Sequence, residues 1–346
     1  MNKETLDKYV SDGWLISNRH PHLPLTIYNY SQATQYEGKW DDITISCRGL
    51  ILDDNGNVIA RPFKKFFNIE EEKHVPTEDF KVYDKMDGSL GILFWYNNDW
   101  HLATRGSFTS DQAIKGKEIL SKYDLRWLSP EFTYLFEIIY PENRIVVNYG
   151  NDEKLVMLGE VHTETGTEDT DFSEYENFGF DVVKMYDAVQ DFDELKALNW
   201  NNKEGFVIKF TNGYRCKIKF EDYVTLHRII TNVSSYDIWE NLKSFGKVDG
   251  ALLTRVPDEF YEWVRGMEGT LKDEYEKIEK EYKWIFNKIT QQLKGDYIPN
   301  NRKTFAKLTK DFKYPGILFS MYDGKDYSQH IWKLIKPEYE KPFANS

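Results

Sequence analysis

Apolar and polar positions alternate with a period of about two along most of the first two thirds of the chain, which predicts β-strands. Three of the expected strand pairs are separated by residues typical of hairpin turns, such as Asp53-Asp54-Asn55-Gly56 and Thr211-Asn212-Gly213. Helical spacing is expected in this part from Ser110 to Tyr123 and from Phe192 to Leu198. The expected strands are Ile43 to Leu52, Val58 to Phe66, Phe80 to Tyr83, Gly91 to Tyr96, Trp100 to Thr104, Thr133 to Tyr140, Arg144 to Tyr149, Lys154 to Val161, Gly205 to Phe210 and Tyr214 to Phe220.

The pattern changes after about Glu221, where apolar residues recur at helical spacing and strand signals become rare. The expected helices are Thr225 to Asn232, Ser235 to Phe245, Asp258 to Leu293 and Thr304 to Phe312. Strands followed by helices indicate an α+β fold class. We expect a strand-rich domain over residues 1–245 and an all-α domain over residues 246–346, with the boundary between Phe220 and Gly250.

Composition places the 346 residues among globular proteins, with 40% apolar, 16% aromatic and 29% charged residues. No apolar run approaches the roughly 20 residues of a membrane span, and the N-terminus lacks the apolar core of a signal peptide. The two cysteines, Cys47 and Cys216, are too few for a disulfide framework. These observations predict a cytoplasmic protein with no membrane partner, and no protein partner is evident.

The net charge of −12 argues at first against a nucleic-acid partner. The charge is unevenly distributed, however: residues 151–204 contain 15 acidic and 4 basic side chains, whereas residues 280–336 contain 5 acidic and 12 basic ones. A basic C-terminal region is compatible with a polyanionic partner.

A candidate nucleophile occurs in Lys85-Met86-Asp87-Gly88-Ser89, because a lysine amine can attack covalently when its surroundings favour the unprotonated form. The same KxDG pattern occurs at Lys247-Val248-Asp249-Gly250, so the pattern alone is weak. Lys85 ends one expected strand and the next begins at Leu90, which predicts a rigid hairpin. Lys247 follows a helical segment, where a plain surface turn is expected.

Charged residues within the apolar strand runs suggest a pocket for an anionic ligand. The acids are Glu137 and Glu204, and the cations are Arg48, Lys64, Lys65, Lys217 and Lys219, the last two on one side of a strand. Each alone is more simply explained as part of the solvated face of an antiparallel sheet. Together they suit a nucleoside triphosphate with Mg²⁺.

At these residues the sequence resembles the ATP-dependent RNA ligase 1 family of T4-like phages, within the covalent nucleotidyltransferases. The resemblance covers nearly the whole chain and includes the Lys85 motif. The other matching segments are Tyr28-Asn29-Tyr30, Cys47-Arg48-Gly49, Arg61 to Asn68, Phe136-Glu137, Pro141 to Val146, Glu204-Gly205, Lys217-Ile218-Lys219 with Tyr223, Arg302 to Ala306 and Ser320 to Gly324.

The resemblance implies an RNA ligase (ATP), EC 6.5.1.3, with a nucleotidyltransferase domain and a C-terminal domain that recognises RNA. Lys85 would form a lysyl-adenylate with ATP, the AMP would pass to an RNA 5′-phosphate, and an RNA 3′-hydroxyl would then displace it. Arg105 and Tyr223 would act in the RNA-ligation step, and Glu204 would hold Mg²⁺. The implied ATP contacts are Tyr28, Arg48, Lys65, Glu137, Lys217 and Lys219. The implied substrate is a cleaved tRNA, in the cytoplasm of an infected host cell if the protein is phage-encoded.

The sequence departs from the family at Met86, where a Glu is expected, and at Arg105, where a Lys is expected. Leu252 and Leu253 replace a pair of acids linked to metal, which puts a second metal site in doubt even though Asp249 is near.

Two alternatives remain at this point. A DNA ligase or capping enzyme would place a β-barrel after Lys219, which the helical C-terminus disfavours. A non-enzymatic RNA-binding module would stack bases on aromatics among the C-terminal cations. The residues concerned are Tyr297, Phe305, Phe312 and Tyr314, with Lys294, Arg302, Lys303, Lys307, Lys310 and Lys313. Helical core aromatics beside solvated lysines explain them equally well.

Overall fold

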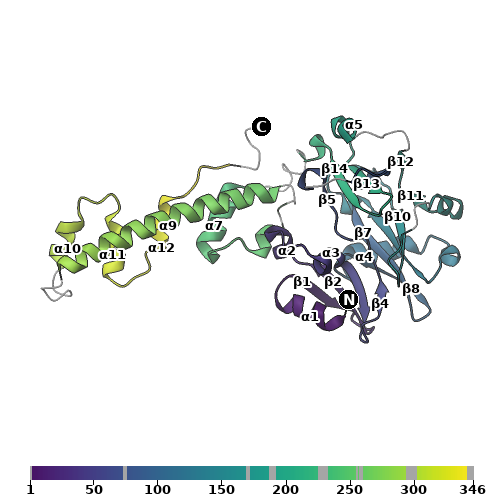
Figure 1. The fold of residues 1–346 in the computed structure, drawn as a ribbon, viewed down its shortest axis with the longest axis horizontal. Helices are drawn as coiled ribbons and strands as arrows, with labels where there is room; N and C mark the ends of the chain where they lie inside the picture. The colour runs from purple at the N-terminus through teal and green to yellow at the C-terminus, as the bar shows by residue number, and fades with distance from the viewer. Residues whose placement is uncertain are drawn as a thin grey trace. The chain divides into compact units, whose positions relative to one another are not determined.

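The chain divides into two compact units, Met1–Ile230 and Thr231–Ser346, in a computed structural model (Figure 1). The structure describes residues 2–72, 76–168, 172–186, 192–224, 233–254, 256, 260–293 and 302–340. The division is between residues 230 and 231. It lies before the expected boundary at 245/246, because the helix Ser235–Phe245 packs against a helix of the second unit.

The described residues of the first unit form three sheets, whose strands agree with the period-two pattern. The first sheet is antiparallel, with the order β1-β2-β3-β4. Its strands are Leu15–Arg19 (β1), Leu25–Tyr30 (β2), Arg48–Asp53 (β3) and Val58–Ala60 (β4).

The second and third sheets have five strands each, in the orders β11-β10-β9-β7-β8 and β12-β6-β13-β14-β5. The strands of the second sheet are Ser89–Tyr96 (β7), Asp99–Thr104 (β8), Phe132–Ile139 (β9), Lys154–His162 (β10) and Asp181–Val182 (β11). Those of the third sheet are Phe67–Asn68 (β5), Phe80–Lys85 (β6), Met185–Tyr186 (β12), Gly205–Phe210 (β13) and Arg215–Lys219 (β14).

Helices cover the outer faces of these sheets, and the apolar side chains of the strands lie between the layers. The first and second sheets pack on each other through residues such as Ile27 and Phe94. The third sheet directs Val82, Phe206 and Ile218 into a separate core. The helices of this unit are Lys3–Ser11 (α1), Gln32–Glu37 (α2), Asp42–Ser46 (α3), Asp111–Leu120 (α4) and Phe192–Ala197 (α5).

Strict alternation on β13 and β14 leaves the opposite face of the third sheet polar. While Phe206 and Ile208 of β13 are in the core, Val207 and Lys209 point the other way, toward a pocket. One face of this sheet therefore supports the fold, and the other carries the candidate chemistry.

Two expected strands are wrong in part. The run from Ile43 begins as helix α3, because Asp41 caps that helix and forms a capping box with Thr44. The run from Val58 is a strand only to Ala60, after which the Arg61 N–H donates to the Thr133 hydroxyl instead of to a neighbouring strand.

The expected strand Arg144 to Tyr149 is absent, although these residues are described. A 3-10 turn, Pro141–Asn143, comes first, and the backbone N–H groups of Val146 and Val147 then bond to the Asp87 carboxylate. A buried acid from elsewhere in the chain thus takes the place of a partner strand.

The expected hairpin around Lys85 is also wrong. Strand β6, which ends at Lys85, pairs with β12 and β13, whereas β7, which begins at Ser89, pairs with β8 and β9. The turn Met86-Asp87-Gly88 therefore connects two different sheets, and Lys85 lies where the chain crosses from one to the other.

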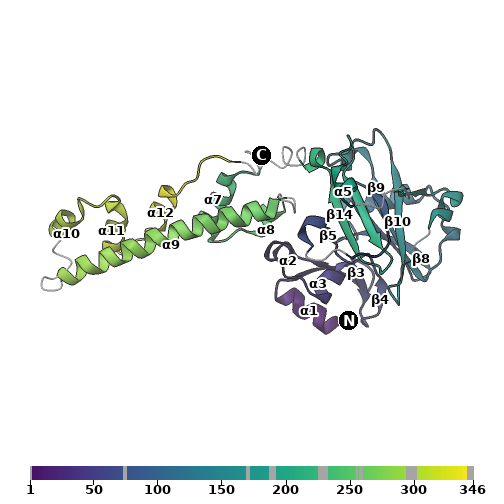
Figure 2. The same cartoon turned by 45° about the horizontal axis from the view of Figure 1, so that its top comes forward.

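The second unit is built around one long helix, Tyr261–Gln292 (α9), along which α7, α11 and α12 pack (Figures 1 and 2). Its other helices are Ser235–Phe245 (α7), Gly250–Leu253 (α8), Arg302–Thr309 (α10), Pro315–Tyr322 (α11) and Ser328–Leu334 (α12). The expected helix Thr225 to Asn232 lies outside the described residues. No strand occurs among the described residues of this unit, so the expected all-α region is confirmed over them.

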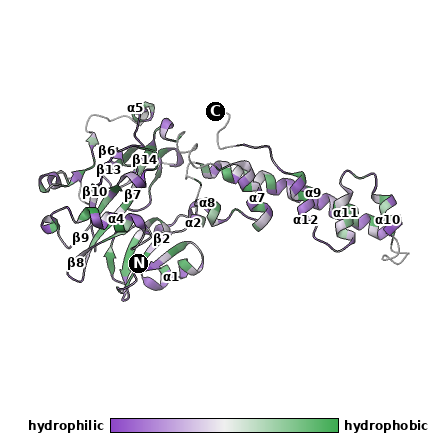
Figure 3. Cartoon of the chain, turned by 180° about the vertical axis from the view of Figure 1, so that it is seen from behind, coloured by the Kyte–Doolittle hydropathy of each residue, from purple (hydrophilic) through white to green (hydrophobic). Residues whose placement is uncertain are grey.

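Hydrophilic and hydrophobic residues both occur along α9 (Figure 3), whose buried positions include Leu271, Tyr282 and Ile289. The long helix is thus amphipathic, with one face in a core. Across the described parts of the chain, no helix combines the length and the apolarity that crossing a bilayer would require.

Candidate active site

Lys85 lies in a row of three residues on adjacent strands of the third sheet. Gly205, the first residue of β13, pairs with Lys85 of β6 on one side and with Lys219 of β14 on the other. The preceding residue, Glu204, places its Oε1 atom 2.7 Å from the Lys85 Nζ and 3.5 Å from the Lys219 Nζ. The Glu204 side chain is only 4% exposed, so this carboxylate is held between two cations with little water. A proton acceptor therefore touches the candidate nucleophile.

Two glycines make this arrangement possible. Gly205 has a φ of +151°, and a Cβ atom there would lie 2.0 Å from the Ile218 carbonyl oxygen of the neighbouring strand. A Cβ on Gly88 would lie 2.7 Å from the Ile138 carbonyl oxygen of β9. Any side chain at either position would push β6, β9 or β14 away from the Lys85 row.

Glu137 of β9 faces this row from the second sheet. Its Oε1 atom accepts a hydrogen bond of 3.0 Å from the Gly88 N–H. Burial raises the pKa of Glu137 to about 8; the charge of Lys85 opposes this shift, and that of Glu204 adds to it. At neutral pH this carboxyl group is therefore protonated, and it can donate a hydrogen bond to a hydroxyl group as well as accept one.

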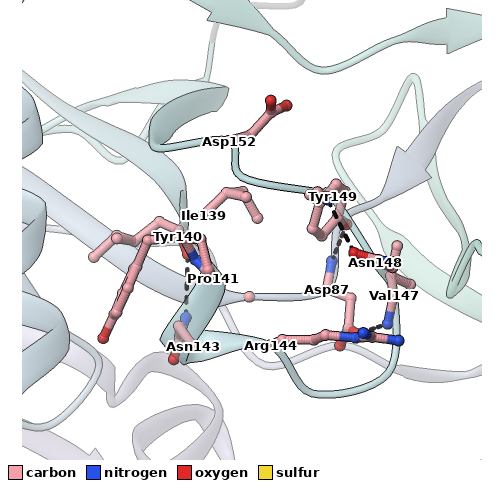
Figure 4. A pocket seen from close by; sticks show the side chains of 13 residues that line it. Asp87, Ile139, Tyr140, Pro141, Asn143, Arg144, Val147, Asn148, Tyr149 and Asp152 are labelled. Atoms are coloured by element: carbon pink, nitrogen blue, oxygen red, sulfur yellow. Dashed lines mark hydrogen bonds between the residues drawn. The ribbon is translucent and has the colours of Figure 1, made fainter.

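Asp87 anchors the turn that follows Lys85 and is only 3% exposed. Its Oδ2 atom accepts from the N–H groups of Val146 (2.8 Å) and Val147 (2.7 Å), and its own N–H donates to the Tyr149 hydroxyl at 2.9 Å. Figure 4 shows Asp87 beside Val147 and Tyr149, at the edge of a small pocket of about 280 Å³. Asp87 thus fixes the position of Lys85 through the backbone.

Tyr223, expected in the RNA-ligation step, contacts both Asp87 and Lys219. It is 3% exposed and donates its hydroxyl to the Asp87 Oδ1 at 2.9 Å. The Lys219 Nζ lies 5.5 Å from the centre of its ring. Through these contacts Tyr223 holds the side chains of Lys219 and Asp87 in position.

Three of the predicted cations gather around a tyrosine that the sequence analysis did not select, Tyr30. Its hydroxyl accepts from Arg105 Nη1 at 3.1 Å and from the Arg48 side chain. The Lys65 Nζ lies 5.5 Å from its ring centre. Arg48, Lys65 and Arg105 therefore form a concentrated positive site, suited to phosphate groups.

Tyr28, predicted as an ATP contact, does not join these cations. It is 0% exposed, packs in the core under the first sheet, and donates its hydroxyl to Asp7 of α1 at 2.9 Å. Tyr30 lies in the same apolar cluster on the same face of β2, but its hydroxyl group accepts from Arg105, whereas that of Tyr28 donates to Asp7.

An open pocket of about 650 Å³ lies between the third sheet and strands β7, β9 and β10. Lys85, Arg48 and Glu137 line it together with apolar residues such as Leu158 and Val207. Lys217 lies on the polar face of the third sheet, two residues before Lys219 on β14. It pairs with Val207 of β13 and with Asn68 of β5. The residues lining this pocket are Arg48, Phe63, Phe66, Tyr83, Asp84, Lys85, Met86, Leu90, Glu137, Leu158, Phe172, Val183, Val207, Lys209 and Arg215.

The second KxDG pattern lies in the helical unit and has no comparable surroundings. Asp249 caps helix α8 by accepting from the Leu252 N–H at 2.8 Å. Leu252 and Leu253 are 5% and 4% exposed and occupy core positions. Within the described residues, no three His, Cys, Asp or Glu side chains are grouped so that they could hold a metal ion.

The aromatics of the C-terminal region are mainly core residues where the structure describes them. Phe305 is 0% exposed, and Phe312 and Tyr314 pack against the same core. Tyr297 and Lys294 lie outside the described residues. Exposed aromatics occur elsewhere in this unit, among them Trp284 on α9, which is 63% exposed with the Lys288 Nζ 5.6 Å from its ring centre.

Three charged residues that the sequence analysis did not select line the pocket: Asp84, Lys209 and Arg215. Lys209 could have been found from sequence, because it is a charged residue within the apolar run Gly205 to Phe210, and a buried lysine needs a partner. Its partner, Glu168, is more than forty residues away and carries no sequence signal.

Comparison with known proteins gives a family. The family model described as RNA ligase matches residues 46–223, which include Lys85, Glu137, Glu204, Lys219 and Tyr223. An RNA ligase of Rhodothermus phage RM378 is 24% identical over 83% of this chain and 83% of its own length.

A protein of Autographa californica nuclear polyhedrosis virus, described as a polynucleotide kinase/RNA ligase, is 31% identical over 54% of this chain. The match spans only 31% of that viral protein. Among solved structures, an archaeal ATP-dependent RNA ligase is similar at a TM-score of 0.47 and 16% identity, over 75% of this chain and 70% of that one.

The family match extends over more than half of the chain and contains the Lys85 row, Glu137 and the Asp87 anchor. This protein belongs to the RNA ligase family.

Proposed function

We propose that this protein is an ATP-dependent RNA ligase, EC 6.5.1.3, which joins RNA 5′-phosphate and 3′-hydroxyl ends through lysyl-adenylate and RNA-adenylate intermediates. The observation that carries the proposal is the Lys85 amine, 2.7 Å from the Glu204 carboxylate at a pocket that Glu137 and Arg48 also line. A binding protein would not need a nucleophile beside a buried proton acceptor at such a position.

In the first step, the Lys85 Nζ attacks the α-phosphorus of ATP. An N–P bond forms, the bond from the α-phosphorus to the bridging oxygen breaks, and pyrophosphate leaves with that electron pair. The amine attacks only without its proton, and Glu204 is placed to accept it. Gly205 pairs with Lys85 on one side and with Lys219 on the other, and this pairing fixes the position of the nucleophile along the strands.

The nucleotide would lie along the polar face of the third sheet. Lys217 and Lys219 offset the phosphate charge from this sheet, and Arg48 and Lys65 do so from the site around Tyr30. Glu137, protonated at neutral pH, would bond to a ribose hydroxyl. Tyr28 contributes to this site only by supporting the first sheet from its core.

A divalent cation, expected as Mg²⁺, fits beside Glu204. Glu204 would supply the ligand oxygen, because the neighbouring Glu137 holds its proton at neutral pH. Mg²⁺ needs only one or two carboxylates when phosphates and water complete its shell. When bound, the ion would neutralise phosphate charge, with Glu204 as its protein ligand.

In the second step, an oxygen of the RNA 5′-phosphate attacks the AMP phosphorus, an O–P bond forms, and the Lys85 N–P bond breaks. In the third, a 3′-hydroxyl attacks the 5′-phosphorus and AMP leaves. Arg105 lies in the cation site around Tyr30 and would hold the RNA phosphate in these steps. Tyr223 would act in them indirectly, by holding Lys219 and Asp87.

The helical unit would recognise the RNA, which we propose to be a cleaved tRNA. Trp284 and Lys288 on α9 offer an exposed ring beside a cation, a combination that stacks on unpaired bases.

Cys47 and Cys216 are both buried free thiols, and burial raises the pKa of each to about 12, which suits a protein of a reducing cytoplasm.

The proposal is tested by sealing a nicked RNA hairpin that carries a 5′-phosphate and a 3′-hydroxyl, with ATP and Mg²⁺. The matched variants are Lys85→Ala and Lys247→Ala, which alter the two KxDG patterns. We expect Lys85→Ala to abolish sealing and Lys247→Ala to retain it. RNA binding by the wild type without sealing or AMP transfer would favour the binding-module alternative.

A further inference from the structure

Asp84 and Lys203, the residues just before Lys85 and Glu204, form an ion pair of their own. The Lys203 Nζ lies 2.5 Å from the Asp84 Oδ2 atom, and the two side chains are only 34% and 13% exposed. We call Asp84 and Lys203 the outer pair, and Lys85 and Glu204 the inner pair. Asp84 and Lys85 end strand β6, whereas Lys203 and Glu204 lead into strand β13. Two ion pairs of opposite polarity therefore connect the same two points of the chain.

The outer pair is completed by Tyr186 of β12. The Tyr186 hydroxyl donates to the Asp84 Oδ1 atom at 2.9 Å and accepts from the Lys203 Nζ at 3.0 Å. The Lys203 Nζ also lies 5.5 Å from the centre of the Trp200 ring. Each of the three polar side chains thus bonds to the other two, and a closed network of this kind holds its members more firmly than a single bond does.

The chain just before Glu204 is anchored at two successive residues. Asn202 accepts a hydrogen bond of 2.6 Å from the Asn148 N–H and donates one of 2.8 Å to the Asn148 carbonyl oxygen. Lys203 follows with its bond to Asp84. These bonds fix where the Glu204 side chain starts, and they do so without any contribution from the Glu204 carboxylate.

The inner pair cannot persist through the reaction of the proposed function, on which this inference rests. Before the first step, the charged Lys85 amine attracts Glu204 at 2.7 Å. Once AMP is attached, the Lys85 nitrogen has given up a proton and is bonded to phosphorus, so it no longer carries a positive charge. Of its two lysine partners in the described part of the chain, Glu204 then keeps only the more distant, Lys219 at 3.5 Å. The outer pair remains, because neither of its members changes charge.

Glu204 is needed again when AMP leaves Lys85 for the RNA. As the N–P bond breaks, the electron pair returns to the Lys85 nitrogen, which must regain a proton. Glu204 accepted that proton in the first step and is placed to return it. Proton transfer requires hydrogen-bond distance, about 2.6–3.2 Å between heavy atoms, so the carboxylate has to stay near Lys85 after the attraction between them is lost.

We propose that the outer pair, with Tyr186, keeps Glu204 within reach of Lys85 while Lys85 carries AMP. Asp84, Lys203 and Tyr186 are positioning residues for the step in which AMP passes to the RNA 5′-phosphate. The proposed function leaves open what holds Glu204 once its closest partner is neutral. The outer pair provides this, because it joins the residues next to Lys85 and Glu204 and is not consumed.

The test compares two steps in the same protein, each in a single turnover. One step is formation of lysyl-adenylate from ATP, and the other is transfer of AMP from the purified lysyl-adenylate to an RNA with a 5′-phosphate. Lys203→Met removes the cation and keeps a side chain of similar length. We expect this variant to slow transfer roughly tenfold or more, with a much smaller effect on lysyl-adenylate formation. In that first step the charged Lys85 still attracts Glu204.

Two further variants separate positioning from general stability. Lys184→Met is the matched control, because the Lys184 Nζ lies 4.7 Å from the same Tyr186 ring and Lys184 is exposed. It should leave the ratio of the two rates unchanged. Lys203→Arg keeps the positive charge and should bring the ratio back to that of the wild type. A merely structural contact would affect the two steps alike, whatever the charge at this position.

An equal loss in both steps, or no loss in either, in a folded Lys203→Met variant would overturn this inference and leave the proposed function standing. So would a change of the same size in Lys184→Met. If Lys203→Met does not fold, Tyr186→Phe decides, because it removes the hydroxyl from the network and leaves both charges: transfer alone should slow, and an unchanged ratio would overturn the inference. A wild-type chain that forms no lysyl-adenylate, or transfers no AMP to RNA, would overturn the proposed function itself.

Discussion

The raised pKa of Glu137 predicts a specific dependence of stability on pH. In the folded protein burial raises this pKa from its ordinary 4.5 to about 8. In the unfolded chain the carboxyl loses its proton near 4.5, so between these values the folded state binds one proton more than the unfolded state. Stability therefore falls as the pH rises from about 4.5 to 8, by up to about 5 kcal/mol at roughly 1.4 kcal/mol for each unit.

The change that isolates this effect is Glu137→Gln, which is neutral at every pH and can still accept the hydrogen bond from the Gly88 N–H. The free energy of unfolding is measured by urea titration of wild type and variant from pH 5 to 8.5, without nucleotide. We expect the variant to gain steadily on the wild type as the pH rises, by several kcal/mol in all. Glu131→Gln, at the exposed residue just before β9, is the control and should show no such gain. A constant difference between Glu137→Gln and wild type across this range would refute the reasoning.

Four other perturbations test the remaining parts of the site. Gly205→Ala places a Cβ against the Ile218 carbonyl and should lower the free energy of unfolding by roughly 2–6 kcal/mol, whereas Gly106→Ala, with no atom within 4 Å of its Cβ, should be nearly neutral in the same urea titration. Tyr223→Phe removes one bond to the buried Asp87 carboxylate and should cost about 1.5–3 kcal/mol by thermal or urea unfolding; no loss would mean that this bond is not formed. Arg105→Ala should slow sealing of pre-adenylated RNA more than formation of the lysyl-adenylate, and equal losses would place Arg105 on ATP instead. Trp284→Ala should weaken RNA binding in a filter-binding assay without changing enzyme adenylation, and unchanged binding would exclude stacking on this ring.

The sequence predicts the elements of this fold well where alternation is strict, as on β13 and β14. It also predicts which residues share the polar face of the third sheet, because Lys217 and Lys219 alternate with Cys216 and Ile218. The resemblance identified Lys85, Glu137 and Glu204, and the structure brings these three together. How residues on separate strands pair is not encoded in such a local pattern.

Tertiary bonding of backbone groups is one source of error. Residues 144–149 have the composition of a strand, but the N–H groups of Val146 and Val147 bond to the carboxylate of Asp87. The turn after Lys85 was read as a hairpin because two strand runs flank it, yet the strands belong to different sheets. In the first case one buried acid, Asp87, determines the local structure from a distance in sequence.

The partners that side chains find in the folded chain are the second source of error. Tyr28 and Tyr30 are separated by one residue, and the strand pattern places them on the same face. Both do lie in one apolar cluster, yet the Tyr30 hydroxyl meets Arg105 while the Tyr28 hydroxyl bonds to Asp7. The ion pairs of Glu168 with Lys209 and Arg215 likewise depend on how the sheets pack, which no spacing in the sequence reveals.

The most direct test of the central claim is to locate the AMP on the protein. The chain is incubated with ATP and Mg²⁺, denatured, digested, and the peptide that carries the AMP mass is sequenced by mass spectrometry under conditions that preserve the N–P bond. We predict AMP on Lys85, beside the Glu204 carboxylate, and on no other lysine. AMP on Lys247 or Lys219, or pyrophosphate release without any adenylated peptide, would contradict the account.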